Sequence, residues 1–176
     1  MKKICIMLLV MWVVLMGVSP VVRAEHSQPP ADTSSPELNR IKSLAGKWTA
    51  TTSMFGTPNQ RIYTEFAVTS GGSVVLERIF PGTPEEMVSV YYDDNGKLAM
   101  THYCIMRNRP TLTLASSNAD TITLDVKKIE GMKSKKDPSM GGVTLQFKDK
   151  NHIVATCRAK GKGHEQPMAI EYSRVK

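Results

Sequence analysis

The stretch KLAMTHYCIM, residues 97–106, follows directly on Asn95-Gly96 and carries the pattern that decides the fold. Asn-Gly tolerates positive φ at both central positions of a tight hairpin turn. After this turn the side chains alternate, so that Leu98 and Met100 share one face of an extended chain while Thr101 lies on the other. The alternation predicts a strand with one buried face, joined to the preceding strand as an antiparallel hairpin.

The same pattern continues along the chain from Trp48. Turn residues such as Gly71-Gly72 and Asn151 separate successive extended runs. Short connections make successive strands antiparallel neighbours, and a chain built only from such neighbours hides its edges best by closing on itself. The sequence therefore predicts an all-β fold, an antiparallel up-and-down barrel of about 8–10 strands. We expect strands at 47–54, 60–69, 73–80, 87–93, 97–106, 111–117, 121–129, 142–149, 152–160 and 166–175.

A short helix is expected before the first strand. Ser35 is a suitable N-cap, and Pro36 occupies the favoured first helical position. Leu38, Ile41 and Leu44 then recur at helical spacing, which gives the helix one apolar face. We expect this helix to plug one end of the barrel.

The chain divides into three parts. Residues 1–24 have a basic start, a long apolar run and Val22-Arg23-Ala24, which is typical of a cleaved signal peptide. A retained membrane anchor is the alternative, because the apolar run nearly reaches the ~20 residues that span a bilayer. Residues 25–36 are polar and proline-rich and indicate a disordered linker, and 37–176 form one domain. We expect a periplasmic or secreted protein, cleaved near Ala24, that is not an integral membrane protein.

Positive charge is concentrated in the segment 127–162, where ten Lys or Arg stand against three acidic residues. Two interpretations stay open. The segment is either a solvated rim whose lysines keep strand edges soluble, or a surface that contacts an anionic membrane or polymer. We expect no nucleic-acid partner, because no aromatic residue lies in the Lys128–Lys136 cluster to stack on bases.

The helix runs into Leu44-Ala45-Gly46-Lys47-Trp48, and the chain ends in a strand that contains Arg174. A short helix followed by Gly-x-Trp, with an arginine in the last strand, resembles the lipocalins and their calycin relatives. The stretch from Phe80 to Tyr92, with Thr101-His102-Tyr103-Cys104, is similar to an uncharacterised bacterial branch of exported lipocalin-like proteins. The resemblance implies that Trp48 closes one end of the barrel and that Arg174 packs across it. It implies a fold more firmly than an activity.

His102 and Cys104 share the apolar face of the strand at 97–106 with Met100 and Met106, so both are expected inside the barrel. There His102 is either a hydrogen-bonded core residue or a polar anchor for a ligand. Catalysis is a further alternative, but residues i and i+2 of one strand do not point at each other. His-x-Cys supplies only two metal ligands, so no metal site is predicted.

The mature chain has two cysteines, Cys104 and Cys157. An even number in an oxidising compartment favours a disulfide, whereas non-neighbouring strands oppose one, so the sequence leaves their pairing open. Tyr92 and Asn108 are further candidates for a polar lining or rim, and no cofactor is indicated.

Three functions stay open at this point. The favoured prediction is an exported barrel that binds a small, mostly hydrophobic molecule, with His102, Cys104, Met100, Met106, Tyr92 and Asn108 as candidate ligand contacts. The alternatives are an enzyme that uses His102 or Cys104 inside the barrel, and a solid-cored protein that docks on anionic surfaces through 127–162. We name no catalytic residues, because motifs such as Cys-x-x-Cys and His-Glu-x-x-His are absent from the sequence.

Overall fold

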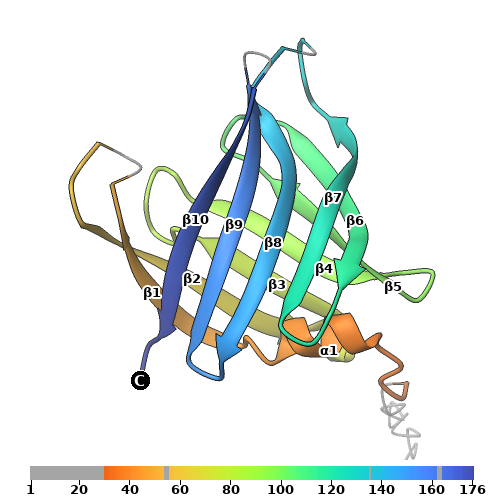
Figure 1. Cartoon of the computed structure of the whole chain (residues 1–176). Coiled ribbons are helices and arrows are strands. Elements are labelled where there is room, and N and C mark those ends of the chain that lie inside the picture. Colours follow the sequence, from red (N-terminus) through yellow and green to blue (C-terminus); the bar gives the residue numbers. More distant parts are fainter. Residues whose placement is uncertain (1–29, 54–55, 135, 162–163) are drawn as a thin grey trace, which may run out of the picture.

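The computed structural model describes residues 30–53, 56–134, 136–161 and 164–176, and these form a closed barrel of ten antiparallel strands (Figure 1). Each strand pairs with the next along the chain, and the first and last strands pair through Trp48 and Arg174 to close the sheet. The up-and-down barrel predicted from the sequence is therefore confirmed. The strands are β1 (Gly46–Thr52), β2 (Gln60–Thr69), β3 (Val74–Ile79), β4 (Met87–Asp94), β5 (Lys97–Tyr103), β6 (Arg109–Ser117), β7 (Thr121–Glu130), β8 (Ser139–Asp149), β9 (His152–Gly161) and β10 (His164–Arg174).

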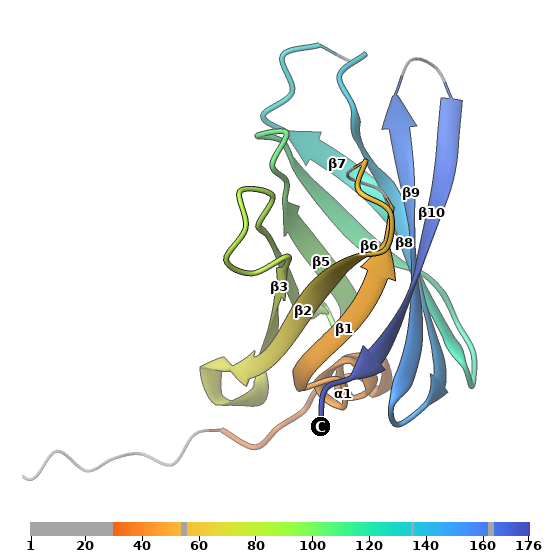
Figure 2. The same cartoon turned by 90° about the vertical axis from the view of Figure 1, so that its left-hand side faces the viewer.

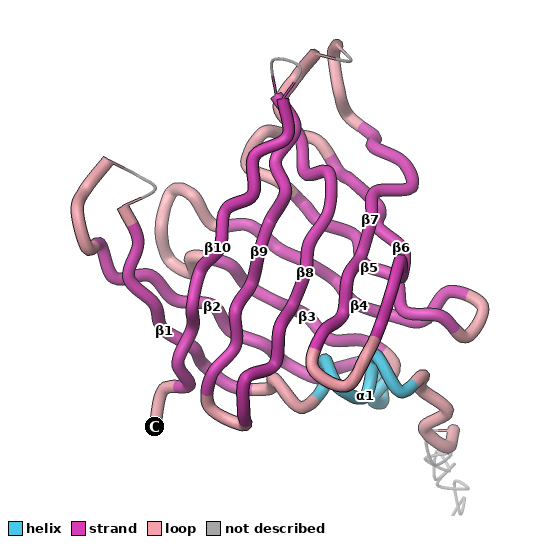
Figure 3. Tube along the Cα trace, viewed as in Figure 1, coloured by secondary structure: helices cyan, strands magenta, loops and turns pink. Residues whose placement is uncertain are grey.

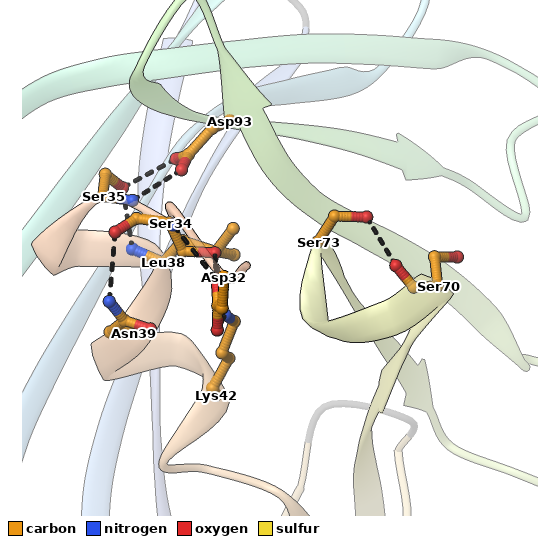
Figure 4. Close-up of polar contacts among 9 residues, drawn as sticks. All are labelled: Asp32, Ser34, Ser35, Leu38, Asn39, Lys42, Ser70, Ser73 and Asp93. Atoms are coloured by element: carbon orange, nitrogen blue, oxygen red, sulfur yellow. Dashed lines mark hydrogen bonds and ion pairs between the residues drawn. The ribbon is translucent and has the colours of Figure 1, made fainter. Parts of the chain in front are cut away.

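One α-helix, α1 (Pro36–Lys42), lies across one end of the barrel, as Figure 2 shows from the side. The Ser35 hydroxyl caps the helix by accepting a hydrogen bond from the Leu38 amide at 3.1 Å. Ser35 in turn donates from its amide and hydroxyl to the Asp93 carboxylate, at 2.6 and 2.7 Å (Figure 4). Leu38 and Ile41 are buried. The start of the helix is thus tied to the end of β4, and its apolar face plugs the barrel.

The residues just before the helix also make defined contacts. Asp32 accepts hydrogen bonds from the Ser34 hydroxyl at 2.6 Å and from the Lys42 ammonium group, which extends from the other end of α1 (Figure 4). A short 3-10 turn, η1 (Ser70–Gly72), joins β2 to β3 nearby. The signal peptide expected at 1–24, and the linker up to residue 29, lie outside the described residues.

Trp48 and Arg174 close the same end of the barrel. The Arg174 guanidinium lies 4.3 Å from the centre of the buried Trp48 ring, which is the contact that the resemblance implied. The guanidinium also donates to the carbonyls of Ala45, Ser43 and Lys150 at 2.6, 2.9 and 3.0 Å. The Trp48 ring nitrogen donates to the Leu44 carbonyl at 2.8 Å. One arginine therefore links the helix, the start of β1 and the turn before β9.

The apolar core fills the barrel next to this closed end. Leu98, Leu112, Ile122 and Leu124 are fully buried, each on the inward face that alternation predicts for its strand. These residues belong to β5, β6 and β7, which are neighbours in the barrel above α1 (Figure 3). The cluster includes Leu38, Ile41, Leu44, Trp48, Ala50, Ile62, Phe66, Val75, Phe80, Tyr91, Leu98, Met100, Leu112, Ile122, Leu124, Val143, Leu145, Ile153 and Tyr172.

Two strand boundaries differ by three residues from the sequence prediction, and the others differ by two residues or fewer. The strand expected at 97–106 ends at Tyr103, because residues 104–107 form a turn in which the Arg107 amide donates to the Cys104 carbonyl at 2.9 Å. Arg107 has a φ of 62°, which an extended strand does not allow. This turn contains no glycine or proline to mark it.

The strand expected from residue 142 begins at Ser139 instead. A bulge between Met140 and Gly142 lets the strand pass through the glycine pair that had indicated a loop. The Arg158 guanidinium occupies the space where a side chain at 142 would lie, since a Cβ there would overlap its Nη2. The loop between β7 and β8 is correspondingly shorter than expected.

Candidate functional site

A cavity of about 230 Å³ occupies the barrel on the side of the core away from α1. Met87 lines it at the start of β4, whose other end at Asp93 holds the helix. The cavity therefore lies toward the barrel end opposite α1, which we call the mouth. Its volume exceeds the ~150 Å³ of a cavity that holds benzene and approaches the ~300–1,000 Å³ of drug-sized sites. The barrel is hollow at this point, which the sequence left undecided.

The walls of the cavity are rich in sulfur. Met106 and Met168, at the mouth, are 53% and 37% exposed, whereas Met100 is buried deep inside. Thioether side chains are flexible and polarisable, so they adapt to irregular apolar shapes. The sulfur-containing lining residues are Met87, Met100, Met106, Met140, Met168, Cys104 and Cys157.

His102 lies inside the barrel, as its position on the strand predicted, and is 2% exposed. Its Nδ1 is 3.0 Å from the Ser89 hydroxyl, opposite it on β4. Burial lowers the pKa of His102 to about 4, so the imidazole is neutral near pH 7. A neutral imidazole can both donate and accept a hydrogen bond, which suits an anchor for an uncharged group.

Glu77 is a lining residue that the sequence analysis did not single out. It is 9% exposed, and its carboxyl Oε2 accepts from the Tyr91 hydroxyl at 2.8 Å. Its Oε1 lies 3.1 Å from the Thr64 hydroxyl. Burial raises the pKa of Glu77 despite opposing hydrogen bonds from Tyr91, Thr64 and Ser89. Burial and the adjacent Glu77 also raise the pKa of Tyr91, so the tyrosine keeps its proton and donates it.

The alternation of side chains along β3 could have identified Glu77 as an inward-facing residue from the sequence alone. Val75, Glu77 and Ile79 share the inward face, and Val75 is fully buried. A carboxyl between two aliphatic residues of one strand face is therefore expected in the interior. The polar part of the cavity is thus formed by Glu77, Ser89, Tyr91 and His102, from β3 to β5. Thr64 on β2 does not line the cavity but contacts Glu77.

Cys104 and Cys157 both line the cavity, and both are free. Cys104 directly follows β5, and Cys157 is on β9, which is not a neighbour of β5 in the barrel. Burial, together with the nearby Cys104, raises the pKa of Cys157 to about 11. Because the thiolate is the nucleophilic form, Cys157 is a poor nucleophile near neutral pH.

Tyr92 and Asn108 are not brought into the same cluster. The Tyr92 hydroxyl is 3.1 Å from the Thr101 hydroxyl on the outer face of the sheet, while its neighbour Tyr91 points inward. Asn108 is buried and donates from Nδ2 to the Pro138 carbonyl at 2.8 Å. Pro138 lines the cavity, so Asn108 positions part of the wall at the mouth.

Other site types find less support in the described part of the chain. No three His, Cys, Asp or Glu side chains there are placed to hold a metal ion together. The same residues include no helix long and apolar enough to cross a bilayer.

Comparison with known proteins adds no family assignment, since the chain matches no family model and no curated protein. The class of protein defined here is a closed ten-stranded antiparallel barrel with an apolar cavity, an architecture compatible with a lipocalin-like fold.

Proposed function

We propose that this protein is an exported lipocalin-like barrel that binds a small, mostly hydrophobic molecule in the cavity at its mouth. The observation that carries the proposal is a hollow of about 230 Å³ walled by methionine, aliphatic and aromatic side chains with a few convergent polar groups. Most small-molecule sites have this composition. The filled, helix-capped end next to Trp48 makes the mouth the side from which the ligand enters.

Each part of the cavity has a role in this proposal. The methionines shape the wall around the ligand. Neutral His102, held through Nδ1 by Ser89, is a polar anchor within the cavity. Cys104 and Pro138 contribute to the rim, and Asn108 holds Pro138 in place.

The enzyme alternative has weaker support. A histidine with a pKa of about 4 is a poor general base near pH 7. In the described residues, no carboxylate is hydrogen-bonded to His102 to orient its ring, as a nucleophile–base pair requires.

Docking of the basic segment on an anionic surface is also less favoured. Two of its basic residues are already paired within the protein: Lys128 contacts Glu130, and Arg158 contacts Asp125.

The proposal is tested by titrating the purified protein with an uncharged dye whose fluorescence rises in apolar surroundings. Ala155→Phe places a ring in the cavity, whereas Ala169→Phe places the same ring at an exposed position of neighbouring β10. We expect saturable binding by the wild type and by Ala169→Phe, and at least tenfold weaker binding by Ala155→Phe. Thermal unfolding of both variants shows that they are folded. Equal binding by all three proteins, or none by the wild type, would exclude the cavity as the site.

A further inference from the structure

Glu77 is an acidic group in the cavity with no cationic partner. It forms no ion pair with any lysine, arginine or histidine in the part of the chain that the structure describes, and the described lining contains no lysine or arginine. His102, the histidine of the described lining, is neutral near pH 7 because burial lowers its pKa to about 4. A buried carboxylate without a counter-charge is costly, so the group either holds a proton or waits for a cation.

The hydrogen bonds around Glu77 fit a bound proton in the empty barrel. The Thr64 hydroxyl lies 3.1 Å from the Glu77 Oε1 and 3.1 Å from the Arg78 carbonyl oxygen. This hydroxyl has one hydrogen, and a carbonyl oxygen can only accept. When Thr64 donates to Arg78, the hydrogen between Thr64 and Glu77 must come from the carboxyl group. Burial, which raises the pKa of Glu77, acts in the same direction.

The charge of the cavity discriminates between ligand classes. An apolar anion, such as a fatty acid, would bring a second acidic group next to Glu77 and would meet no cation in the described lining. A cation supplies the one charge that the site lacks. The rings of Phe80, Tyr91 and Tyr172 also line the cavity, and aromatic faces attract organic cations. An ionised carboxylate has about four acceptor sites, so hydrogen bonds from Tyr91, Thr64 and Ser89 leave one site on Glu77 for an N–H of the ligand.

We propose that the ligand of this cavity is a small apolar molecule with one basic amine, bound as an ammonium ion against the carboxylate of Glu77. This inference rests on the proposed function, because it names the class of molecule that the same cavity takes. Once Glu77 is ionised, the Thr64 hydroxyl donates to its Oε1 instead of to the Arg78 carbonyl, and the Tyr91 hydroxyl donates to its Oε2. The sulfur-rich wall contacts the apolar part of the ligand.

Binding releases a proton under this scheme. A free alkylamine is protonated near pH 7, with a pKa of about 10 like that of lysine. Glu77 holds a proton in the empty barrel and loses it to the buffer when the ammonium ion binds. The other titratable groups that face the cavity are Tyr91 from β4, His102 from β5, Cys104 after it, Cys157 from β9 and Tyr172 from β10. Burial raises the pKa values of Tyr91, Cys157 and Tyr172 and lowers that of His102, so these four groups are uncharged near neutral pH. Affinity for the amine therefore rises with pH until Glu77 is ionised in the free protein.

The test compares three probes of equal chain length, n-octylamine, n-octanol and octanoate, by calorimetric titration. Glu77→Gln keeps the size of the side chain and its contacts with Tyr91 and Thr64 but cannot ionise. Glu171→Gln is the matched control, because Glu171 is exposed on the outer face of β10. We expect the wild type and Glu171→Gln to bind octylamine more tightly than octanol, and octanoate most weakly. In Glu77→Gln, we expect the affinity for octylamine to fall by about tenfold to a hundredfold, which is the usual effect of losing one hydrogen bond to a charged group. We expect the affinity for octanol to be unchanged.

The outcomes separate this inference from the proposed function. If octanol binds but octylamine binds no better, or if Glu77→Gln binds octylamine as the wild type does, the amine inference is wrong and the binding function stands. If no probe binds the wild type, the binding function itself is wrong. Titration in two buffers of different ionisation enthalpy counts protons, and we expect one released per octylamine in the wild type. A count of zero would overturn the neutral Glu77 of the empty barrel. Proton release and the amine preference are both measured on the wild type, so the test remains decisive if Glu77→Gln fails to fold.

Discussion

Replacement of Arg174 by methionine should show how much the closed end of the barrel contributes to stability. Methionine keeps an unbranched apolar stem but removes the guanidinium over Trp48 and three hydrogen bonds to backbone carbonyls. A cation–π contact at a partly exposed site contributes about 0.5–1 kcal/mol, and each hydrogen bond about 0.5–1.5 kcal/mol. Since water can replace part of these hydrogen bonds, we expect the free energy of unfolding to fall by about 2–4 kcal/mol.

Urea unfolding followed by the fluorescence of Trp48 measures this loss directly. Arg61→Met is the matched control, because Arg61 is exposed on β2. Arg174→Lys should recover only part of the loss, since an ammonium group cannot reach several carbonyls in a fixed fork. If Arg174→Met is no less stable than Arg61→Met, the guanidinium does not hold the barrel end together and the reasoning is refuted.

Three further predictions concern buried groups and one turn. Burial lowers the pKa of His102 from 6.5 to about 4. The neutral imidazole therefore contributes its full share of the folding free energy above pH 6.5 and loses it as the pH falls to 4, a loss of up to about 3 kcal/mol. We expect His102→Gln to remove this part of the fall in stability when urea unfolding is measured between pH 7 and pH 4. Because the pKa of Cys157 is raised from 9.0 to about 11, its alkylation near pH 7, followed by peptide mass spectrometry, should be about a hundredfold slower than in the urea-unfolded chain; an equal rate would contradict its burial. Gly131→Ala should destabilise the protein by at least about 1–2 kcal/mol more than Gly96→Ala in thermal unfolding. Both glycines have positive φ, but only at Gly131 would a Cβ lie 2.7 Å from a backbone oxygen, that of Arg107. Equal losses of stability in the two variants would show that the backbone moves to accommodate the Cβ at no cost.

The sequence predicted the strands and their sidedness well, because these depend on local patterns. Alternation placed Leu98, Met100 and His102 on the inner face, and the structure has them buried there. Gly and Asn marked most turns correctly. The turn at 104–107 was missed because Arg107 adopts positive φ without any residue type that signals it. The glycines at 141 and 142 predicted a loop where the structure has a strand, because Gly142 makes room for Arg158 within that strand.

The cavity could not be predicted from the sequence in the same way. Whether inward side chains fill a barrel or leave a hollow depends on how their volumes meet across strands far apart in the chain, such as Met87 on β4 and Met168 on β10. The environment of Glu77 likewise depends on how separate strands meet. Its inward direction follows from neighbours on β3, but its partners Thr64 and Tyr91 come from β2 and β4 through the register of the sheet.

The tie between Ser35 and Asp93 fixes where the chain enters the barrel. The described chain starts beside α1, and β10 ends at that same base, where the Val175 amide donates to the Lys47 carbonyl at 2.8 Å (Figure 1). An affinity tag or surface linker attached through the C-terminus would therefore sit below the closed floor. On a sensor chip that holds the protein by this linker, the mouth of each barrel would face outward and stay accessible to molecules in solution.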